Sequence, residues 1–198
     1  MQNAHKFKNL PNYLTLLRIL LIPVVVILYF IQPIYELYPN FSWLNFSLVA
    51  VLSVASATDL IDGYLARKWG VSSRLGAFLD PVADKLMVVV ALILLIDFYQ
   101  IWYITLSATI IITREILVSA LREWLAETGN RDTIKVSNFG KLKTFVQVFA
   151  ILFLFYQADF FGVNSFSVGV ILLIFATILT IISGYQYLIA TLKVTKNA

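Results

Sequence analysis

The chain has 198 residues, of which 60% are hydrophobic and only 13% are charged. A soluble domain of this size is roughly half apolar and about a quarter charged, so the composition excludes an ordinary soluble protein and indicates a membrane protein. The net charge of +4 is small, and its distribution along the chain matters more than its size. We expect no nucleic-acid partner, and the chain has no cysteine for disulfides or thiolate metal sites.

Six apolar stretches follow one another along the chain, each long enough to cross a hydrocarbon core of about 30 Å with about 20 residues. They cover residues 14–31, 43–62, 80–99, 101–121, 144–161 and 166–190. A polar stub, residues 1–13, precedes them and lacks the shape of a signal peptide. The sequence therefore predicts an all-α integral membrane protein. It forms one domain, residues 1–198, with six transmembrane helices and a short N-terminal interfacial segment.

A proline near the start of the third span makes two starting points of its helix possible. Pro81 either begins the helix, with Asp80 as its cap, or kinks a helix that begins earlier. Sequence patterns alone favour neither arrangement.

Basic residues give the orientation of the spans, because Lys and Arg are retained in cytoplasmic loops. All 15 of them lie at the two termini, in the second and fourth loops, or at the adjoining helix ends. The opposite loops carry Glu36, Asp97 and Asp159 and no basic residue. Both termini are therefore expected on the cytoplasmic side.

The segment ATDLIDGYLARKWGVSSRLGAFLDPVADKLM carries four aspartates at the inner ends of the second and third spans. An aspartate at the centre of a membrane helix costs about 2.5–3.5 kcal/mol, so this group needs compensation. Asp59 and Asp62 are three residues apart, and Asp80 and Asp84 are four apart, which puts each pair on one helix face. The hairpin between them, residues 63–79, is short enough to bring the two faces together.

Four carboxylates at these spacings predict a site for hard divalent cations. Mg²⁺ in particular binds few carboxylates together with substrate phosphates. Two metal ions bridged by shared carboxylates are a recurring arrangement for phosphoryl displacement. The alternative interpretation is that the acids pair with Arg67, Arg74 and Lys85, or lie in the headgroup zone.

Residues 59–84 read D-x-x-D-G-x-x-A-R-x8-G-x3-D-x3-D, which resembles the signature of the CDP-alcohol phosphatidyltransferases. The signature positions are filled by Asp59, Asp62, Gly63, Ala66, Arg67, Gly76, Asp80 and Asp84. The six-span, inner-facing architecture fits this family over the whole chain. The resemblance implies an enzyme that binds CDP-diacylglycerol, or another CDP-alcohol, with two divalent cations, Mg²⁺ or Mn²⁺. It then transfers the phosphatidyl group to an alcohol and releases CMP.

The resemblance also implies a role for each signature residue. The implied metal ligands are Asp59, Asp62, Asp80 and Asp84. Asp84 also matches the general base of the family. The implied nucleotide-pocket positions are Gly63, Ala66, Arg67 and Gly76. The segment PNYLTLLR resembles the family's opening segment and implies that Asn12 and Thr15 lie near the cytidine or its phosphates. A helix cap in an interfacial stub is the other interpretation of Thr15.

The chemistry of the available residues agrees with a direct displacement. An alcohol oxygen must attack a negatively charged pyrophosphate, so cations must neutralise that charge while a carboxylate accepts the hydroxyl proton. The chain has no nucleophilic cysteine, and His5, its only histidine, lies in the stub, where we expect it to be exposed. We therefore expect no covalent enzyme intermediate.

A second set of charged residues bears on the acceptor alcohol. The segment TREILVSALREW places Arg114 and Glu115 inside the fourth apolar stretch, and IKVSNFGKLKT adds Lys135 and Lys141 before the fifth. An intramembrane arginine generally faces a cavity and pairs with something. Glu115 lies about 100° away on the helix, so it is expected to be an awkward partner for Arg114. A phosphate-bearing acceptor would supply an anion for the guanidinium fork and the lysines.

The short segments TRE and GKLKT resemble the phosphatidylglycerophosphate synthases within the family. That resemblance implies sn-glycerol 3-phosphate as the acceptor, with its phosphate held by Arg114, Lys135 and Lys141. Inositol phosphate is the nearest alternative acceptor, and serine fits less well because it carries no phosphate. Arg131 and Lys143, taken singly, are interpreted as solvated loop charges.

Two other classes of protein compete with the enzyme. An ion or proton-coupled transporter needs charges distributed across the bilayer or broken helices near its midplane, whereas these acids cluster at inner helix ends. A membrane scaffold leaves the four-aspartate pattern unexplained. We therefore expect a multi-pass enzyme of the cytoplasmic (inner) membrane, in contact with membrane lipids and with its active site facing the cytoplasm. The family resemblance implies a homodimer.

Overall fold

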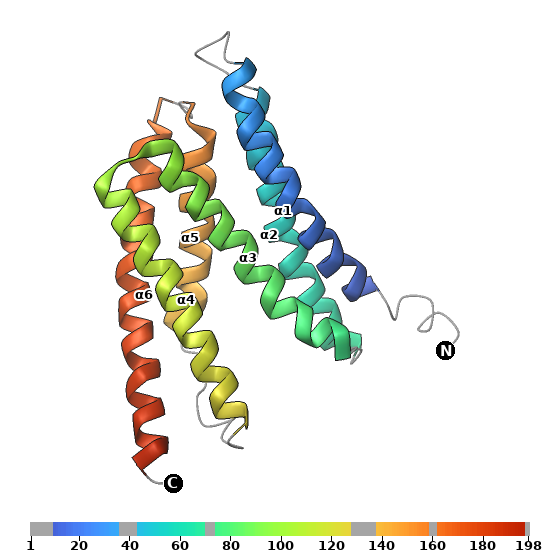
Figure 1. Ribbon diagram of the computed structural model, residues 1–198, viewed down its shortest axis with the longest axis vertical. Helices are drawn as coiled ribbons and strands as arrows, with labels where there is room; N and C mark the ends of the chain where they lie inside the picture. Colours follow the sequence, from blue (N-terminus) through green and yellow to red (C-terminus); the bar gives the residue numbers. More distant parts are fainter. Residues whose placement is uncertain (1–9, 36–42, 70–73, 128–137, 159–161, 197–198) are drawn as a thin grey trace. The chain divides into compact units, whose positions relative to one another are not determined.

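Six α-helices account for nearly all of the described residues in the computed structural model (Figure 1). The structure describes residues 10–35, 43–69, 74–127, 138–158 and 162–196. Within these ranges it describes all side chains except those of residues 10–12, 32–35, 44, 59–69, 74–81, 84, 138–141 and 193–196. The helices are α1 (Leu10–Tyr35), α2 (Trp43–Trp69), α3 (Arg74–Tyr99), α4 (Trp102–Glu127), α5 (Asn138–Tyr156) and α6 (Ser165–Lys196). The all-α prediction is confirmed.

The helices extend beyond several of the apolar stretches that predict them. α1 begins at Leu10, within the predicted stub, and α5 begins at Asn138, ahead of its predicted start. α3 begins at Arg74, so Pro81 lies inside a helix that starts earlier and Asp80 is not its cap. The reason is physical: hydropathy marks the part of a helix that suits hydrocarbon, whereas the helix itself continues as long as its backbone hydrogen bonds are made.

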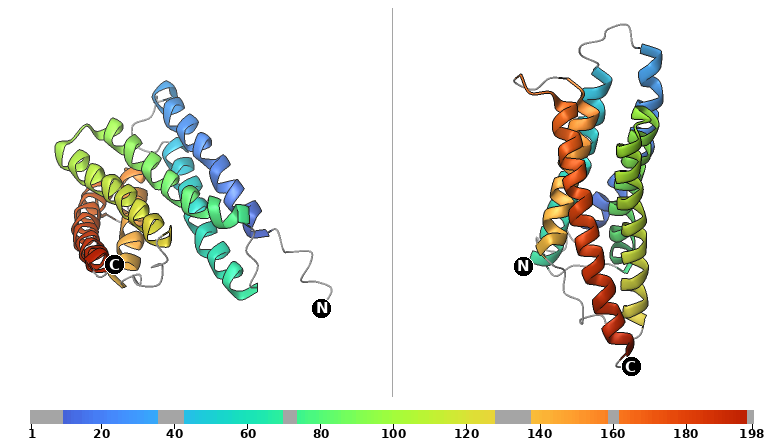
Figure 2. Two further views of the ribbon diagram at one scale, coloured as in Figure 1. Left: turned by 60° about the horizontal axis from the view of Figure 1, so that its bottom comes forward. Right: turned by 90° about the vertical axis from the view of Figure 1, so that its left-hand side faces the viewer.

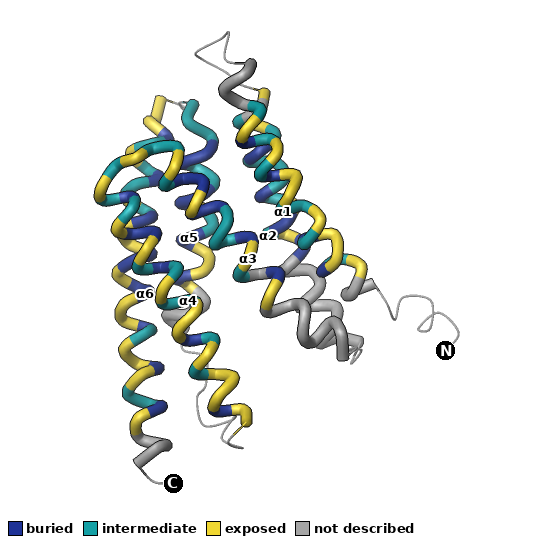
Figure 3. The backbone as a smooth tube through the Cα atoms, viewed as in Figure 1, coloured by how far each residue is buried: buried dark blue, intermediate teal, exposed yellow. Residues whose placement is uncertain are grey.

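Long apolar helices indicate a membrane protein. Three segments among the described residues are long and apolar enough to cross a bilayer: Tyr13–Ile31, Trp102–Glu127 and Ser165–Leu192. Asn45–Thr58 and Leu142–Tyr156 are shorter apolar helical segments. Exposed residues recur along the helices (Figure 3), and many are large and apolar, as at Phe30, which is 62% exposed, and Ile171, which is 66% exposed. A soluble protein rarely leaves so much apolar surface in water.

The chain divides into two compact units. The first comprises Met1–Leu94 and Phe155–Ala158, and the second comprises Leu95–Leu154 and Asp159–Ala198. In the first unit, α1 and α2 lie side by side (Figure 1). The face that α1 buries includes Thr15, Arg18, Val25 and Tyr29, at spacings that recur on one side of a helix.

In the second unit, α4 and α6 lie against each other (Figure 2). The buried face of α6 is built mostly from small and hydroxyl-bearing residues: Gly169, Leu173, Ala176, Thr180, Ser183, Tyr187 and Thr191. Small side chains let membrane helices approach closely. The threonine hydroxyls are satisfied within the helix, since Thr180 donates to the Ala176 carbonyl at 2.6 Å and Thr191 to the Tyr187 carbonyl at 2.9 Å.

Leu154 of α5 is a packing centre of the second unit. The Tyr99 hydroxyl, at the end of α3, donates to the Leu154 carbonyl oxygen at 2.7 Å, and the Tyr99 ring lies 5.2 Å from that of Phe166 in α6. A Cβ atom added at Gly169 would lie 2.7 Å from the Leu154 Cγ atom and 3.1 Å from its backbone nitrogen. Position 169 therefore has no room for a side chain without a shift of α5 against α6.

Replacing Gly169 by valine is expected to destabilise the second unit, because overpacking of this kind costs about 1–3 kcal/mol. Gly169→Ala should have a smaller effect in the same direction. The measurement is the temperature at which the purified protein in detergent loses its monodisperse elution peak. The control is Ile171→Val on the exposed side of the same helix. A Gly169→Val protein as heat-resistant as the wild type would contradict the close contact.

Candidate active site

The four aspartates of the signature lie within two helices of the first unit, toward the ends that face the connection between them. Asp59 and Asp62 lie in α2, and Asp80 and Asp84 lie in α3. The structure describes their backbone as helical, but their side chains lie outside the described residues. The same holds for the predicted nucleotide-pocket positions Asn12, Gly63, Ala66, Arg67 and Gly76. Their site assignments therefore remain predictions.

The helix register relates these positions to the buried faces of α2 and α3. In α2, Leu48, Leu52 and Ala55 are buried at alternating steps of four and three, and the next positions in that series are 59 and 62. In α3, Met87, Ala91 and Leu94 form the corresponding buried series, and reading it backwards reaches positions 84 and 80. Residues spaced in this way share one side of a helix. All four aspartate positions thus fall in the same helical register as those buried residues.

The helix bounds also place the two aspartate pairs at matching heights. α2 ends at Trp69 and α3 begins at Arg74, so only four residues connect them. At 1.5 Å per residue, Asp62 lies about 10 Å from the end of α2, and Asp80 about 9 Å from the start of α3. Asp59 and Asp84 each lie about 15 Å from the same ends. Helices joined by so short a connection are commonly antiparallel neighbours, in which equal heights coincide.

Among the side chains that the structure describes, no group of three or more His, Cys, Asp or Glu could hold a metal ion. The four signature aspartates lie outside that set. Of the predicted nucleotide residues, Thr15 has a described side chain, and it is fully buried on α1. Arg18, one turn further along, is also buried, at 2% exposure. The charge of Arg18 predicts only a place on the cytoplasmic side, although an arginine inside an apolar run also indicates an interior position.

Arg114 of α4 lies inside the second unit with specific contacts to α6. Its side chain is 13% exposed. Its Nη2 atom donates to the Ser183 hydroxyl at 2.9 Å, and that hydroxyl donates in turn to the Thr180 carbonyl at 3.1 Å. The Arg114 Nε atom is buried and has no hydrogen-bond partner among the described residues. A buried donor left in this way costs free energy unless water or a ligand satisfies it.

One expectation about the charges near Arg114 is wrong. Lys143, expected to be solvated, is 1% exposed, and its Nζ atom donates to the Glu115 carboxylate. It is buried because α5 begins at Asn138, which makes position 143 part of a helix rather than of a loop. Glu115, expected to be an awkward partner for Arg114, has its Oε1 atom 3.7 Å from the Arg114 Nη1 atom, which is too long for a hydrogen bond. The hydrogen bond of this carboxylate comes from Lys143.

Arg122 meets α6 through an aromatic ring. Its Nη2 atom donates to the Tyr187 hydroxyl at 2.5 Å, and its Cζ atom lies 4.9 Å from the centre of that ring. The Arg114 Cζ atom lies 5.6 Å from the centre of the same ring. Neither Tyr187 nor Ser183 is among the predicted site residues, although two polar residues at helical spacing in a long apolar helix indicate a buried polar contact.

Together, Arg114, Arg122, Lys143 and Glu115 form a cluster, here called the basic cluster, in which Arg114 and Lys143 lie near the one carboxylate and Arg122 shares the Tyr187 ring with Arg114. Lys135 and Lys141, the other predicted phosphate ligands, lie outside the described side chains. Arg114 and Lys143 are shielded from water, which strengthens their attraction for an anion, whereas Arg122 is exposed. Guanidinium groups match phosphate and carboxylate with paired hydrogen bonds. The arrangement can therefore bind an anion such as a phosphate ester.

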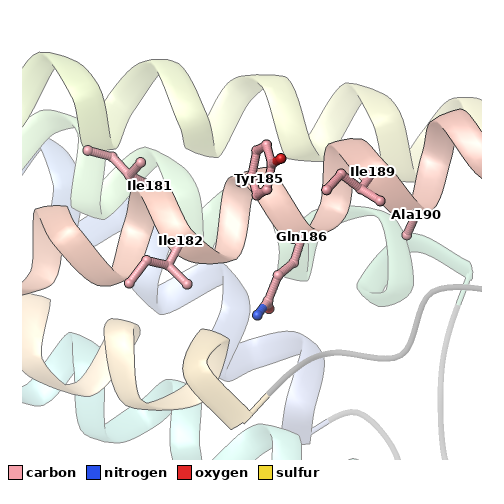
Figure 4. Close-up of a pocket in the computed structure, with 6 residues that line it drawn as sticks. All are labelled: Ile181, Ile182, Tyr185, Gln186, Ile189 and Ala190. Carbon is pink, nitrogen blue, oxygen red and sulfur yellow. The ribbon is translucent and has the colours of Figure 1, made fainter.

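A separate groove runs along the exposed side of α6 and is a poorer candidate (Figure 4). It is lined by Ile181, Ile182, Tyr185, Gln186, Ile189 and Ala190. All six residues come from one helix, and most are aliphatic. Such a surface suits lipid chains and offers no charged group for catalysis.

Comparison with known proteins identifies relatives over most of the chain. The sequence model of the family described as CDP-alcohol phosphatidyltransferase matches residues 8–182. CDP-diacylglycerol–glycerol-3-phosphate 3-phosphatidyltransferase of Shigella flexneri serotype 5b (strain 8401) is 42% identical over 182 residues, which cover 92% of this chain and 94% of the relative. The protein of the same description from Escherichia coli (strain K12) is similar to the same extent, with 42% identity over 182 residues.

Proposed function

The chain belongs to the CDP-alcohol phosphatidyltransferase family, and from this premise we propose that it makes phosphatidylglycerophosphate. In the proposed reaction, the phosphatidyl group of CDP-diacylglycerol passes to sn-glycerol 3-phosphate, and CMP is released. The relatives that share 42% of their residues with the chain are described by this donor and this acceptor.

The observation that carries the proposal is the complete signature at positions 59–84. Its aspartates occur as two pairs on helices α2 and α3, on positions that continue the buried faces. Carboxylates in such positions are costly without a compensating cation. This supports a shared cation site rather than four scattered surface charges.

The donor set fits two divalent cations, Mg²⁺ or Mn²⁺, because both favour oxygen ligands. Asp59, Asp62, Asp80 and Asp84 would hold them. When bound, these ions neutralise the negative charge of the pyrophosphate and of the departing CMP. The match between these residues and divalent cations is supported by their chemistry, because all four side chains offer carboxylate oxygens.

Asp84 is proposed as the general base of the transfer. The hydroxyl oxygen of the acceptor forms a bond to the phosphorus that carries diacylglycerol, and the bond from that phosphorus to the bridging oxygen of CMP breaks. The hydroxyl proton passes to the Asp84 carboxylate, and CMP leaves with the electron pair of the broken bond. A positioned carboxylate typically accelerates such a proton transfer about 10²- to 10⁴-fold.

The nucleotide end of the donor is proposed to lie along the signature and the start of α1. Residues with little or no side chain at Gly63, Ala66 and Gly76 would let the nucleotide approach the helix backbone. Arg67 would supply charge to a phosphate. The implied contacts from α1 are Asn12 and Thr15.

The acceptor end is proposed to lie at the basic cluster. Arg114 would bind the acceptor phosphate, assisted by Lys135 and Lys141. The burial of Arg114 and its unsatisfied Nε atom support this role, because they leave a donor for an anion. Inositol phosphate would use the same charges, whereas serine would leave them unpaired.

The proposed setting is the bacterial inner membrane, with six spans, both termini and the active site on the cytoplasmic side, and two copies per assembly. The distribution of Lys and Arg supports this orientation. Both proposed substrates would then be available where the site opens, since glycerol 3-phosphate is water-soluble and CDP-diacylglycerol is a lipid.

The test offers purified protein in detergent several labelled acceptors in parallel, with CDP-diacylglycerol held constant. With glycerol 3-phosphate we expect CMP release and a labelled lipid product, and with inositol phosphate or serine we expect little product. Excess chelator should abolish the activity, and added Mg²⁺ or Mn²⁺ should restore it. If serine were the only acceptor that gave a lipid product, the assignment of glycerol 3-phosphate as the acceptor would be wrong. Activity that persists in excess chelator would overturn the cation site.

A further inference from the structure

Tyr187 of α6 lies against two guanidinium groups of α4. The side chain is 3% exposed and belongs to the buried face that α6 turns toward α4. The Cζ atoms of Arg114 and Arg122 lie 5.6 Å and 4.9 Å from the centre of its ring. Both distances are within the range of a cation–π interaction. One aromatic ring thus contacts both arginines of the basic cluster.

This arrangement addresses a physical difficulty of placing two arginines near each other. Arg114 and Arg122 are eight residues apart on α4, which is a rise of about 12 Å, and both carry long side chains with many rotamers. Like charges that converge also repel each other. A ring with a negative face attracts both guanidinium groups, and so it restricts their positions and offsets part of the repulsion.

Hydrogen bonds from α6 complete the restraint. The Tyr187 hydroxyl accepts from Arg122 Nη2 at 2.5 Å, and the Ser183 hydroxyl, one turn earlier, accepts from Arg114 Nη2 at 2.9 Å. Gly184 leaves the space that the arm of Arg114 occupies, since a Cβ atom there would lie 3.2 Å from Arg114 Cγ. Each guanidinium group therefore uses an Nη2 N–H to form a hydrogen bond with α6, and its other N–H groups can donate to a ligand.

We propose that Tyr187 is a positioning residue of the acceptor site, which holds Arg114 and Arg122 so that the two guanidinium groups bind one phosphate monoester together. This inference rests on the proposed function and adds Arg122 to the residues that recognise the acceptor. Two guanidinium groups suit a phosphate monoester, which carries up to two negative charges and presents three terminal oxygens. The family match ends at residue 182, so neither Ser183 nor Tyr187 falls within it.

Two substitutions of Tyr187 distinguish the effect of its ring on acceptor binding from the effect of its hydroxyl group. Tyr187→Leu removes both, and Tyr187→Phe keeps the ring but loses the acceptor of the Arg122 hydrogen bond. We expect Tyr187→Leu to raise the KM for glycerol 3-phosphate roughly tenfold or more and Tyr187→Phe to raise it roughly threefold. The KM for CDP-diacylglycerol should stay unchanged in both. Inorganic phosphate, used as a competitive inhibitor, should weaken in parallel with the acceptor.

The matched control is Tyr185→Leu, a tyrosine on the same helix that is 65% exposed and lines the outer groove (Figure 4). It should leave both KM values unchanged. A double variant of Tyr187→Leu with Arg122→Gln should lose less than the two single changes added together, because part of the effect of Tyr187 acts through Arg122 and the rest through Arg114.

The outcomes distinguish this inference from the proposed function. If the wild-type protein uses no phosphate-bearing acceptor, the proposed function fails and the positioning role fails with it. If the wild type uses glycerol 3-phosphate but Tyr187→Leu lowers only kcat and leaves the KM and the phosphate inhibition unchanged, Tyr187 is a packing residue and the inference alone is overturned. Additive effects in the double variant would overturn it as well.

Discussion

Replacing Asp84 by asparagine is expected to reduce the turnover number about 10²- to 10⁴-fold. Asparagine has nearly the same shape as aspartate, so the packing around position 84 should change little. Its neutral amide cannot accept the hydroxyl proton of the acceptor, and it contributes no negative charge to the proposed cation site. The loss should therefore appear in kcat, and the protein should remain folded.

The measurement is CMP release with both substrates saturating, in Mg²⁺ and then in Mn²⁺. The matched control is Asp97→Asn, an aspartate at the other end of the same helix and outside the signature. We expect the control to retain the activity of the wild type. An Asp84→Asn enzyme with undiminished kcat would exclude Asp84 as the base and require another acceptor for the proton.

The sequence alone predicts the helices of this protein because their apolar stretches are long and separated by polar connections. Every expected span corresponds to a helix among the described residues, as α4 (Trp102–Glu127) does for the stretch 101–121. The ends are less predictable. Pro81 illustrates why: a proline is compatible with a helix start and with a kinked interior, and only the start of α3 at Arg74 decides between them.

The signature aspartates are also recognisable from sequence, since their spacing needs only local helical geometry. Contacts between helices are a different matter. Arg114 meets Ser183 across 69 positions of sequence, and Arg122 meets Tyr187 across 65. No local pattern encodes such a pairing, because it depends on how α4 and α6 pack.

The burial of Lys143 could not be predicted from the sequence either. A lysine next to a basic loop is usually solvated, and its charge alone gives no sign of burial. Its position becomes special only because α5 starts at Asn138 and because Glu115 on α4 is within reach of its ammonium group. Buried charges of this kind are retained only when a partner compensates them.

Replacing Arg114 by glutamine is expected to raise the KM for glycerol 3-phosphate strongly. Removing one partner of a buried, hydrogen-bonded charge pair costs about 2–5 kcal/mol. At about 1.4 kcal/mol for each factor of ten, this corresponds to a rise of roughly 30-fold or more. The KM for CDP-diacylglycerol should not change, because the proposed role of Arg114 is confined to the acceptor.

The contacts around Arg114 indicate that the Arg114→Gln protein will still fold. Glu115 keeps Lys143 as its partner, and the Ser183 hydroxyl keeps its hydrogen bond to the Thr180 carbonyl. Among the described residues around Arg114, no carboxylate is therefore left buried without a cation.

The conservative variant Arg114→Lys keeps the charge but loses the planar fork, so its KM should fall between those of the wild type and Arg114→Gln. Steady-state kinetics with each substrate varied in turn would decide the matter. Equal rises in both KM values would show that Arg114 supports the fold of the whole site instead of binding the acceptor phosphate.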